Sequence, residues 1–248
     1  MWSAGTAHQE YRLTRIGLLA GLVFAMLLVV VTIVRYPGDA DSTSRYLRLG
    51  LFAVLALLSI GGWIALRGPN ITRAHTALAL RYGTRAGLLF GLLWLFEIGF
   101  NNLLPPEIST ASARSWVDNG IWAIIAGLTI VVAATCALRT RRIVAGVQAG
   151  FWSGLISGLI ACLIGLLLVT ASMNLLLRDP LAIQEFAERG AASGAPNMPT
   201  YVAYGTMTGA LLHLFVLGIG FGTILGVLGG LVGKGIALVR RKPSPLGP

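Results

Sequence analysis

Residues 149–175, AGFWSGLISGLIACLIGLLLVTASMNL, form an uninterrupted stretch without a charged side chain. A helix that crosses the hydrocarbon core of a bilayer needs about 20 such residues. Comparable apolar stretches occur at 16–34, 49–66, 86–104, 120–138 and 206–233. We therefore predict an all-α polytopic membrane protein, a bundle of six transmembrane helices that forms a single transmembrane domain over residues 1–248.

The composition excludes an ordinary soluble domain. The chain has 248 residues, of which 56% are hydrophobic and 11% are charged, whereas a soluble domain has about 25% charged residues. The longest segment between two predicted spans has about 30 residues, which is too short for a soluble domain with its own core. No phosphate-binding loop, dinucleotide-binding glycine pattern, H-E-x-x-H or C-x-x-C occurs. We therefore expect no enzymatic activity.

Charge and cysteine usage indicate the lipid bilayer, and not nucleic acid, as the main partner. A net charge of +10 would suggest nucleic acid in a soluble protein, but in a membrane protein it reflects basic loops near anionic headgroups. Cys136 and Cys162 both lie in apolar stretches, where a thiol behaves as a small hydrophobic group. We expect no disulfide, no metal site and no cofactor.

Lysine and arginine are distributed unevenly between the loops. Of 19 such residues, thirteen lie in the two terminal segments and the even-numbered loops, and six lie in the odd-numbered loops. Because cytoplasmic loops are enriched in Lys and Arg, we predict that both termini are cytoplasmic and that the protein lies in the plasma membrane of a prokaryote. The first span is longer than the apolar region of a signal peptide, about 7–15 residues, and no small-x-small cleavage site follows it, so we interpret it as a retained helix.

The odd-numbered spans open with similar sequences. Gly17 follows Arg15 in IGLLAG, Gly87 follows Arg85 in AGLLFG, and Gly150 opens the related AGFWSG. The intervals of 70 and 63 residues between these glycines suggest three tandem helical hairpins.

Two loops contain further helical signals. Residues 71–82 mix basic and apolar side chains and are predicted to lie in the inner headgroup region. Asp179 and Pro180 form an N-cap and first-turn pair, which predicts an interfacial helix over 179–190 on the outer surface.

Glycines at helical spacing indicate close packing between helices. Lipid supplies no hydrophobic drive for helix association, so small residues allow the backbones to approach. The last span has a row of four glycines at intervals of four residues, and shorter rows occur in spans three and five. The predicted packing residues of this glycine zipper are Gly87, Gly91, Gly150, Gly154, Gly158, Gly218, Gly222, Gly226 and Gly230. Internal packing, self-association and a gating seam all use such rows.

Glu97 is the only acidic residue within a predicted span. Asn101 follows one helical turn later on the same face, and His213 lies at a similar depth, about 10 Å from the outer surface at 1.5 Å per residue. We expect Glu97, Asn101 and His213 to form an intramembrane polar site, with Glu97 and His213 as neighbours. Intramembrane acids paired with histidine occur in proton relays and cation sites. The alternative is that Glu97 is protonated or bonded to Asn101 and only ties helices together.

These features leave two function classes open. An intramembrane serine protease is disfavoured because Ser153 and Ser157 lack the G-x-S-G pattern, and Ser153 is expected near the opposite face from His213. A non-enzymatic scaffold or accessory subunit, with a membrane protein partner or a second copy, is favoured because the inner half of the spans has few polar groups beyond these two serines. A small-solute or proton-coupled transporter that uses Glu97 and His213 is the alternative.

Overall fold

The chain folds into a bundle of long helices. The computed structural model describes residues 4–38, 40–66, 74–105 and 107–240. Within these ranges there is no strand, and six helical stretches are long and apolar enough to cross a membrane, which confirms the predicted all-α polytopic bundle. The elements are α1 (Ala4–Arg35), α2 (Ala40–Leu66), α3 (Ala74–Leu103), α4 (Ala111–Thr140), α5 (Ile143–Ala171), α6 (Met173–Leu176), α7 (Pro180–Ser193), α8 (Met198–Leu212), the π-helical segment η1 (His213–Phe221) and α9 (Gly222–Val239).

Polar side chains mark the start of three helices. Thr110, Asp179 and Asn197 precede α4, α7 and α8, and each side chain accepts a hydrogen bond from a backbone N–H of the following first turn. These bonds satisfy donors that have no partner within the helix. The α7 helix covers most of the segment where we predicted an interfacial helix at 179–190.

Most helices extend beyond the apolar stretches in the sequence, but α5 ends at Ala171, before the end of the predicted span 149–175, and the short helix α6 follows after Ser172. Residues 74–82 form the first turns of α3, so they are not a separate interfacial segment, and residues 71–73 lie outside the described part of the chain. The last span begins at Met198 and ends at Val239. Hydropathy detects only the apolar middle of each span, whereas backbone hydrogen bonding continues into the polar flanks.

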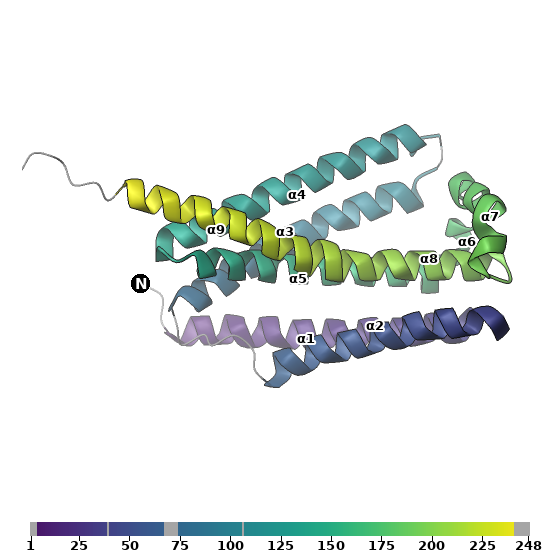
Figure 1. Cartoon of the computed structure of the whole chain (residues 1–248), viewed down its shortest axis with the longest axis horizontal. Coiled ribbons are helices and arrows are strands. Elements are labelled where there is room, and N and C mark those ends of the chain that lie inside the picture. Colours follow the sequence, from purple (N-terminus) through teal and green to yellow (C-terminus); the bar gives the residue numbers. More distant parts are fainter. Residues whose placement is uncertain (1–3, 39, 67–73, 106, 241–248) are drawn as a thin grey trace, which may run out of the picture.

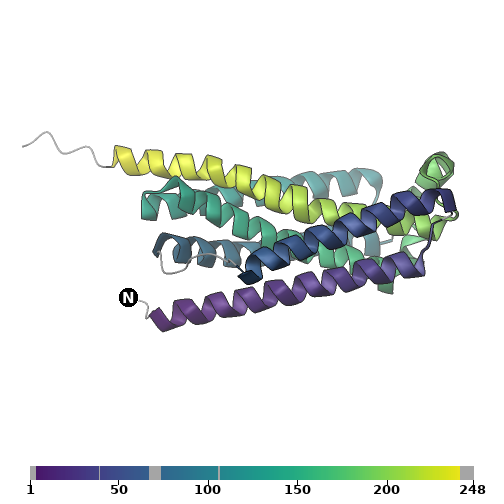
Figure 2. The same cartoon turned by 60° about the horizontal axis from the view of Figure 1, so that its bottom comes forward.

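The two ends of the bundle contain different helices. The first turns of α1 and the last turns of α9 lie at one end, which we call the terminal end, while α6 and α7 lie at the other, the α7 end (Figure 1). The α1–α2 hairpin lies along one side of the bundle in both views (Figure 1 and Figure 2). Tyr46 stacks on Tyr204 at 3.9 Å between ring centroids, and Trp63 stacks on Trp152 at 6.0 Å. These aromatic pairs attach α2 to the central helices.

Helix α5 is the central element. It packs against α1, α3, α4, α8, η1 and α9, and its span is far more buried than the others. Glycines allow several of these helices to approach α5 closely. A Cβ on Gly222 would lie 2.7 Å from the carbonyl oxygen of Gly150, and one on Gly87 would lie 2.8 Å from Cβ of Ile156. Real Cβ atoms do not come so close. The other predicted packing positions with such tight or backbone contacts are Gly91, Gly154, Gly158, Gly218, Gly226 and Gly230.

The three similar span openings do not make equivalent contacts. A Cβ on Gly17 would have no neighbour within 4 Å, whereas one on Gly87 would meet Ile156 and one on Gly150 would meet the backbone of α9. Two glycines that the sequence did not single out, Gly229 and Gly233, bring α9 against the backbone of α4. The helical hairpins therefore differ in how they use their glycines.

Candidate functional site

A cavity of about 340 Å³ lies between α3, α5 and α8, next to α7. Its polar lining residues are Glu97, Asn102, Glu185, Tyr201, Thr206 and His213, and we call it the acidic cavity. Glu185 is exposed on α7, whereas Glu97 is only 7% exposed. The acidic cavity therefore extends from the surface at the α7 end to a carboxyl group inside a span.

Glu97 belongs to a chain of polar groups that joins two helices. The Asn101 Nδ2 group donates to Glu97 Oε1 at 2.6 Å and to Asp118 Oδ1 at 2.7 Å. Glu97 Oε2 and Asn101 Oδ1 are buried and have no hydrogen-bond partner in the described part of the chain. Buried polar atoms without partners are rare in native proteins, so these two acceptor oxygens need an explanation.

Local helix geometry produces this arrangement. Glu97 and Asn101 are one turn apart on α3, which places both side chains on the same face. Asp118 lies in the second turn of α4, in the part of the helix that precedes the apolar stretch at 120–138. The sequence prediction missed Asp118 because it treated this residue as part of a loop. The signal available was the position of Asp118 just before the apolar stretch, at the same end of the bundle as Glu97.

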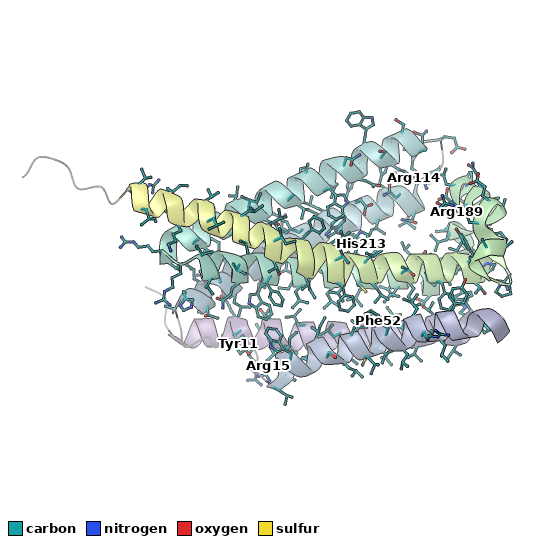
Figure 3. The ribbon with its side chains drawn as sticks, in the orientation of Figure 1. Tyr11, Arg15, Phe52, Arg114, Arg189 and His213 are labelled. Carbon is teal, nitrogen blue, oxygen red and sulfur yellow. The ribbon has the colours of Figure 1, made fainter. Side chains whose placement is uncertain are left out.

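His213 lies at the first residue of η1 and faces the acidic cavity. Figure 3 places it midway along the last span. Its Nδ1 atom is 2.8 Å from the carbonyl oxygen of Gly209, and its ring meets the Trp94 ring edge to face, with 4.9 Å between centroids. Among the described residues no hydrogen bond joins His213 to Glu97. The structure places both on one cavity, and their direct or water-bridged pairing stays a prediction.

Aromatic rings separate the acidic cavity from a second one. Trp94 contacts both His213 and Trp122, the latter at 5.0 Å between centroids. Trp94 and Trp122 also line a cavity of about 300 Å³ between α3, α4, α5 and the last span, together with Thr129 and Ser157. We call this the apolar cavity. Because His213 lines the acidic cavity and Trp94 lines the apolar cavity, the Trp94–His213 contact forms part of the wall between them, which we call the partition.

A partly buried ion pair fixes the α7 end beside the acidic cavity. Arg114 of α4 binds both carboxylate oxygens of Asp179, at 2.7 and 3.2 Å, and also binds Ser109. Figure 3 shows Arg114 at this end of the bundle. Because Asp179 also caps α7, this bidentate pair holds the start of α7 against α4.

The serine hydroxyl groups of α5 are hydrogen-bonded within their own helix. Ser153 Oγ donates to the Gly150 carbonyl at 2.9 Å, and Ser157 Oγ donates to the Gly154 carbonyl at 3.3 Å. Neither hydroxyl is hydrogen-bonded to His213 in the described part of the chain. The arrangement gives no activated nucleophile.

The chemistry of the site is that of oxygen acceptors beside a histidine. Two carboxyl groups and an amide oxygen favour a proton or a small cation as the bound species. Over residues 4–38, 40–66, 74–105 and 107–240, no group of three or more His, Cys, Asp or Glu side chains is placed to hold a metal ion. Comparison with protein families, with curated proteins and with solved structures finds no match to this chain.

Proposed function

We propose that the protein is a membrane carrier that binds a proton or a small cation in the acidic cavity, with Glu97 as the binding carboxyl group. The observation that carries this proposal is that Glu97, whose buried Oε2 atom has no hydrogen-bond partner among the described residues, lines a cavity that also reaches the exposed Glu185. An intramembrane carboxyl group is costly to bury. A bound proton or cation would offset that cost.

The groups around Glu97 define a route for the bound species. A species that enters beside Glu185 meets Glu97 and His213, and the Trp94–His213 contact then separates it from the apolar cavity. The π-helical turn begins at His213, and π-helical segments are frequent at functional sites. In this proposal, movement of η1 relative to Trp94 opens the partition.

The proposed setting is a prokaryotic plasma membrane, with both termini in the cytoplasm and the acidic cavity open to the outside. The distribution of Lys and Arg supports this orientation. In the same proposal, the glycine rows of α5 and the last span act as a glycine zipper that closes the terminal half of the bundle.

Proton flux into liposomes tests the carrier. Vesicles that hold a pH-sensitive dye and the reconstituted protein would be given an inward proton gradient with a potassium–valinomycin potential. We expect flux above that of empty vesicles, lost in Glu97→Gln and kept in Glu188→Gln. The glutamine side chain introduced by Glu97→Gln would still accept the hydrogen bond from Asn101, whereas Glu188 is exposed on α7 and outside the cavity lining.

Chemical modification is a second test, which applies even if proton movement needs an unidentified co-substrate. A hydrophobic carbodiimide reacts with protonated carboxyl groups in apolar surroundings. We expect Glu97 to be modified and the modification to slow as the pH rises. Absence of both flux and modification, in protein that is still folded, would refute the carrier proposal.

The second candidate is the non-enzymatic scaffold or accessory subunit. The close α5–α9 crossing at the terminal end favours it, because a Cβ on Gly226 would lie 3.1 Å from the Gly146 carbonyl oxygen and one on Gly230 2.9 Å from that of Ile143. Such packing leaves little room for a solute. A scaffold would show no flux, and crosslinking in membranes would yield a defined membrane protein partner or a homo-oligomer.

A further inference from the structure

Two cavities flank the first turns of α3 at the terminal end, far from the acidic cavity. The first has a volume of about 460 Å³, lies between α1 and α3, and is lined by Glu10, Tyr11, Leu13, Arg81 and Arg85 among others. Figure 3 shows Tyr11 at this end of α1. The second, of about 780 Å³, lies between α3 and the end of α4. Both are bounded by Ala74 and Leu78, so they are neighbours across α3.

Positive charge exceeds negative charge in this region. Glu10 is 3.7 Å from Arg81 and 3.3 Å from Arg85, so one carboxylate faces two guanidinium groups. The second cavity is lined by Arg139 and Arg142 and by no acidic residue of the described chain. The surplus of arginine favours an anionic ligand.

Other groups at the same place support an anion. Thr84 lines the first cavity, and among the residues that the structure describes its buried Oγ1 atom has no hydrogen-bond partner. The first turn of α3, which begins at Ala74, borders both cavities, and the positive end of the helix dipole favours negative charge at that border, about 10 Å from Arg81.

The position of the two cavities along the spans indicates which kind of anion they bind. They lie where the spans starting at Gln9 and Ala74 begin and where the span ending at Thr140 ends, which is the headgroup region of a bilayer. Leu13, which is 63% exposed, and Leu78 form an apolar wall beside the arginines. A free phosphate ion would leave this wall in water, whereas an acyl chain would cover it.

We propose that this region binds an anionic phospholipid. Its phosphate lies at Arg81 and Arg85, where Glu10 competes for the same guanidinium groups, and one acyl chain lies along Leu13 and Leu78 between α1 and α3. Basic clusters at the membrane surface attract anionic lipids by about fivefold in affinity per arginine. The site does not depend on the function proposed for the acidic cavity.

Lipid add-back to delipidated protein tests the site. Native mass spectrometry would count bound phosphatidylglycerol, with phosphatidylcholine and inorganic phosphate as separate probes. The double variant Arg81→Gln/Arg85→Gln should lose most of the bound phosphatidylglycerol, whereas Glu10→Gln should bind it more tightly because the competing carboxylate is gone. Arg240→Gln, which removes a charge from the same end of the bundle but outside both cavities, should leave binding unchanged.

Three results would overturn the proposal. Equal losses in the double variant and in Arg240→Gln would mean that net charge alone attracts the lipid. Equal binding of phosphatidylcholine would show that no anionic group is recognised. Phosphate that displaces the lipid with similar affinity would make the site a free-anion site. If the double variant folds poorly, Glu10→Gln still tests the proposal, because it should increase the binding of phosphatidylglycerol instead of reducing it.

Discussion

Asn101 is the residue on which the polar site depends. Its amide nitrogen is the donor shared by Glu97 and Asp118, at 2.6 and 2.7 Å. Asn102, its neighbour, instead donates to the Ile98 carbonyl of its own helix at 2.8 Å. The two adjacent asparagines therefore have different hydrogen-bond partners: Asn101 joins α3 to α4, whereas Asn102, which also lines the acidic cavity, bonds within α3.

Replacing these two asparagines separately tests that difference. Asn101→Leu should destabilise the protein by about 1–3 kcal/mol, because two carboxyl groups lose their shared donor in a partly buried site. Asn102→Leu should cost less, since the Ile98 carbonyl keeps its helical surroundings. Thermal unfolding in detergent measures both variants. Equal losses of stability in the two variants would mean that the hydrogen bonds from Asn101 to the two carboxyl groups stabilise the protein no more than the bond from Asn102 to its own helix.

The sequence allowed half of this site to be predicted. Glu97 was found because an acid inside an apolar stretch is conspicuous, and Asn101 followed from helical spacing. Asp118 was missed because its role depends on how α3 and α4 cross, which no local pattern specifies. The contact between Trp94 and His213 was missed for the same reason, because it depends on the packing of the last span against α3.

At the scale of elements, the last span combines a predictable and an unpredictable feature. Its glycine row follows from four-residue spacing alone, and the row does lie against α5. The π-helical segment η1 was not predicted, because the spacing of glycines and apolar residues over 213–221 does not distinguish a π-helix from an α-helix. Hydropathy likewise located every span but shortened most of them, because polar flanking residues continue the helices.

Glycine substitutions in α9 should separate packing from helix propensity. Gly222→Ala should destabilise the protein, because its Cβ would lie 2.7 Å from the Gly150 carbonyl oxygen. Gly235→Ala on the same helix should be neutral or stabilising by up to about 1 kcal/mol, since nothing lies within 4 Å of its Cβ and alanine favours helix.

Larger side chains should widen the difference. We expect Gly222→Leu or Gly226→Leu to disrupt folding far more than Gly235→Leu or Leu225→Ala, because a leucine in the α5–α9 contact would push two backbones apart. Melting curves in detergent measure all of these variants. If Gly226→Leu melted at the same temperature as the parent protein, the close approach of α5 and α9 would not contribute to stability.

At the scale of the whole molecule, the two ends of the bundle have different charge chemistry. At the α7 end, Arg114 is neutralised by Asp179, and Glu185 and Glu188 lie on the exposed side of α7. At the terminal end, Glu10 is shared between two arginines, while Arg139, Arg142, Lys234 and Arg240 lie near the helix ends. The acidic cavity opens at the end with less positive charge.

This asymmetry predicts the orientation in the membrane. Lys and Arg near span ends are retained on the cytoplasmic side, whereas acids contribute little, so the terminal end should be cytoplasmic and the α7 end outside. Reporter fusions after residue 144 and at the C-terminus should therefore give a cytoplasmic signal, and a fusion near residue 192, at the end of α7, should give an external one. An external signal from the C-terminal fusion would reverse the orientation, and the acidic cavity would then open to the cytoplasm.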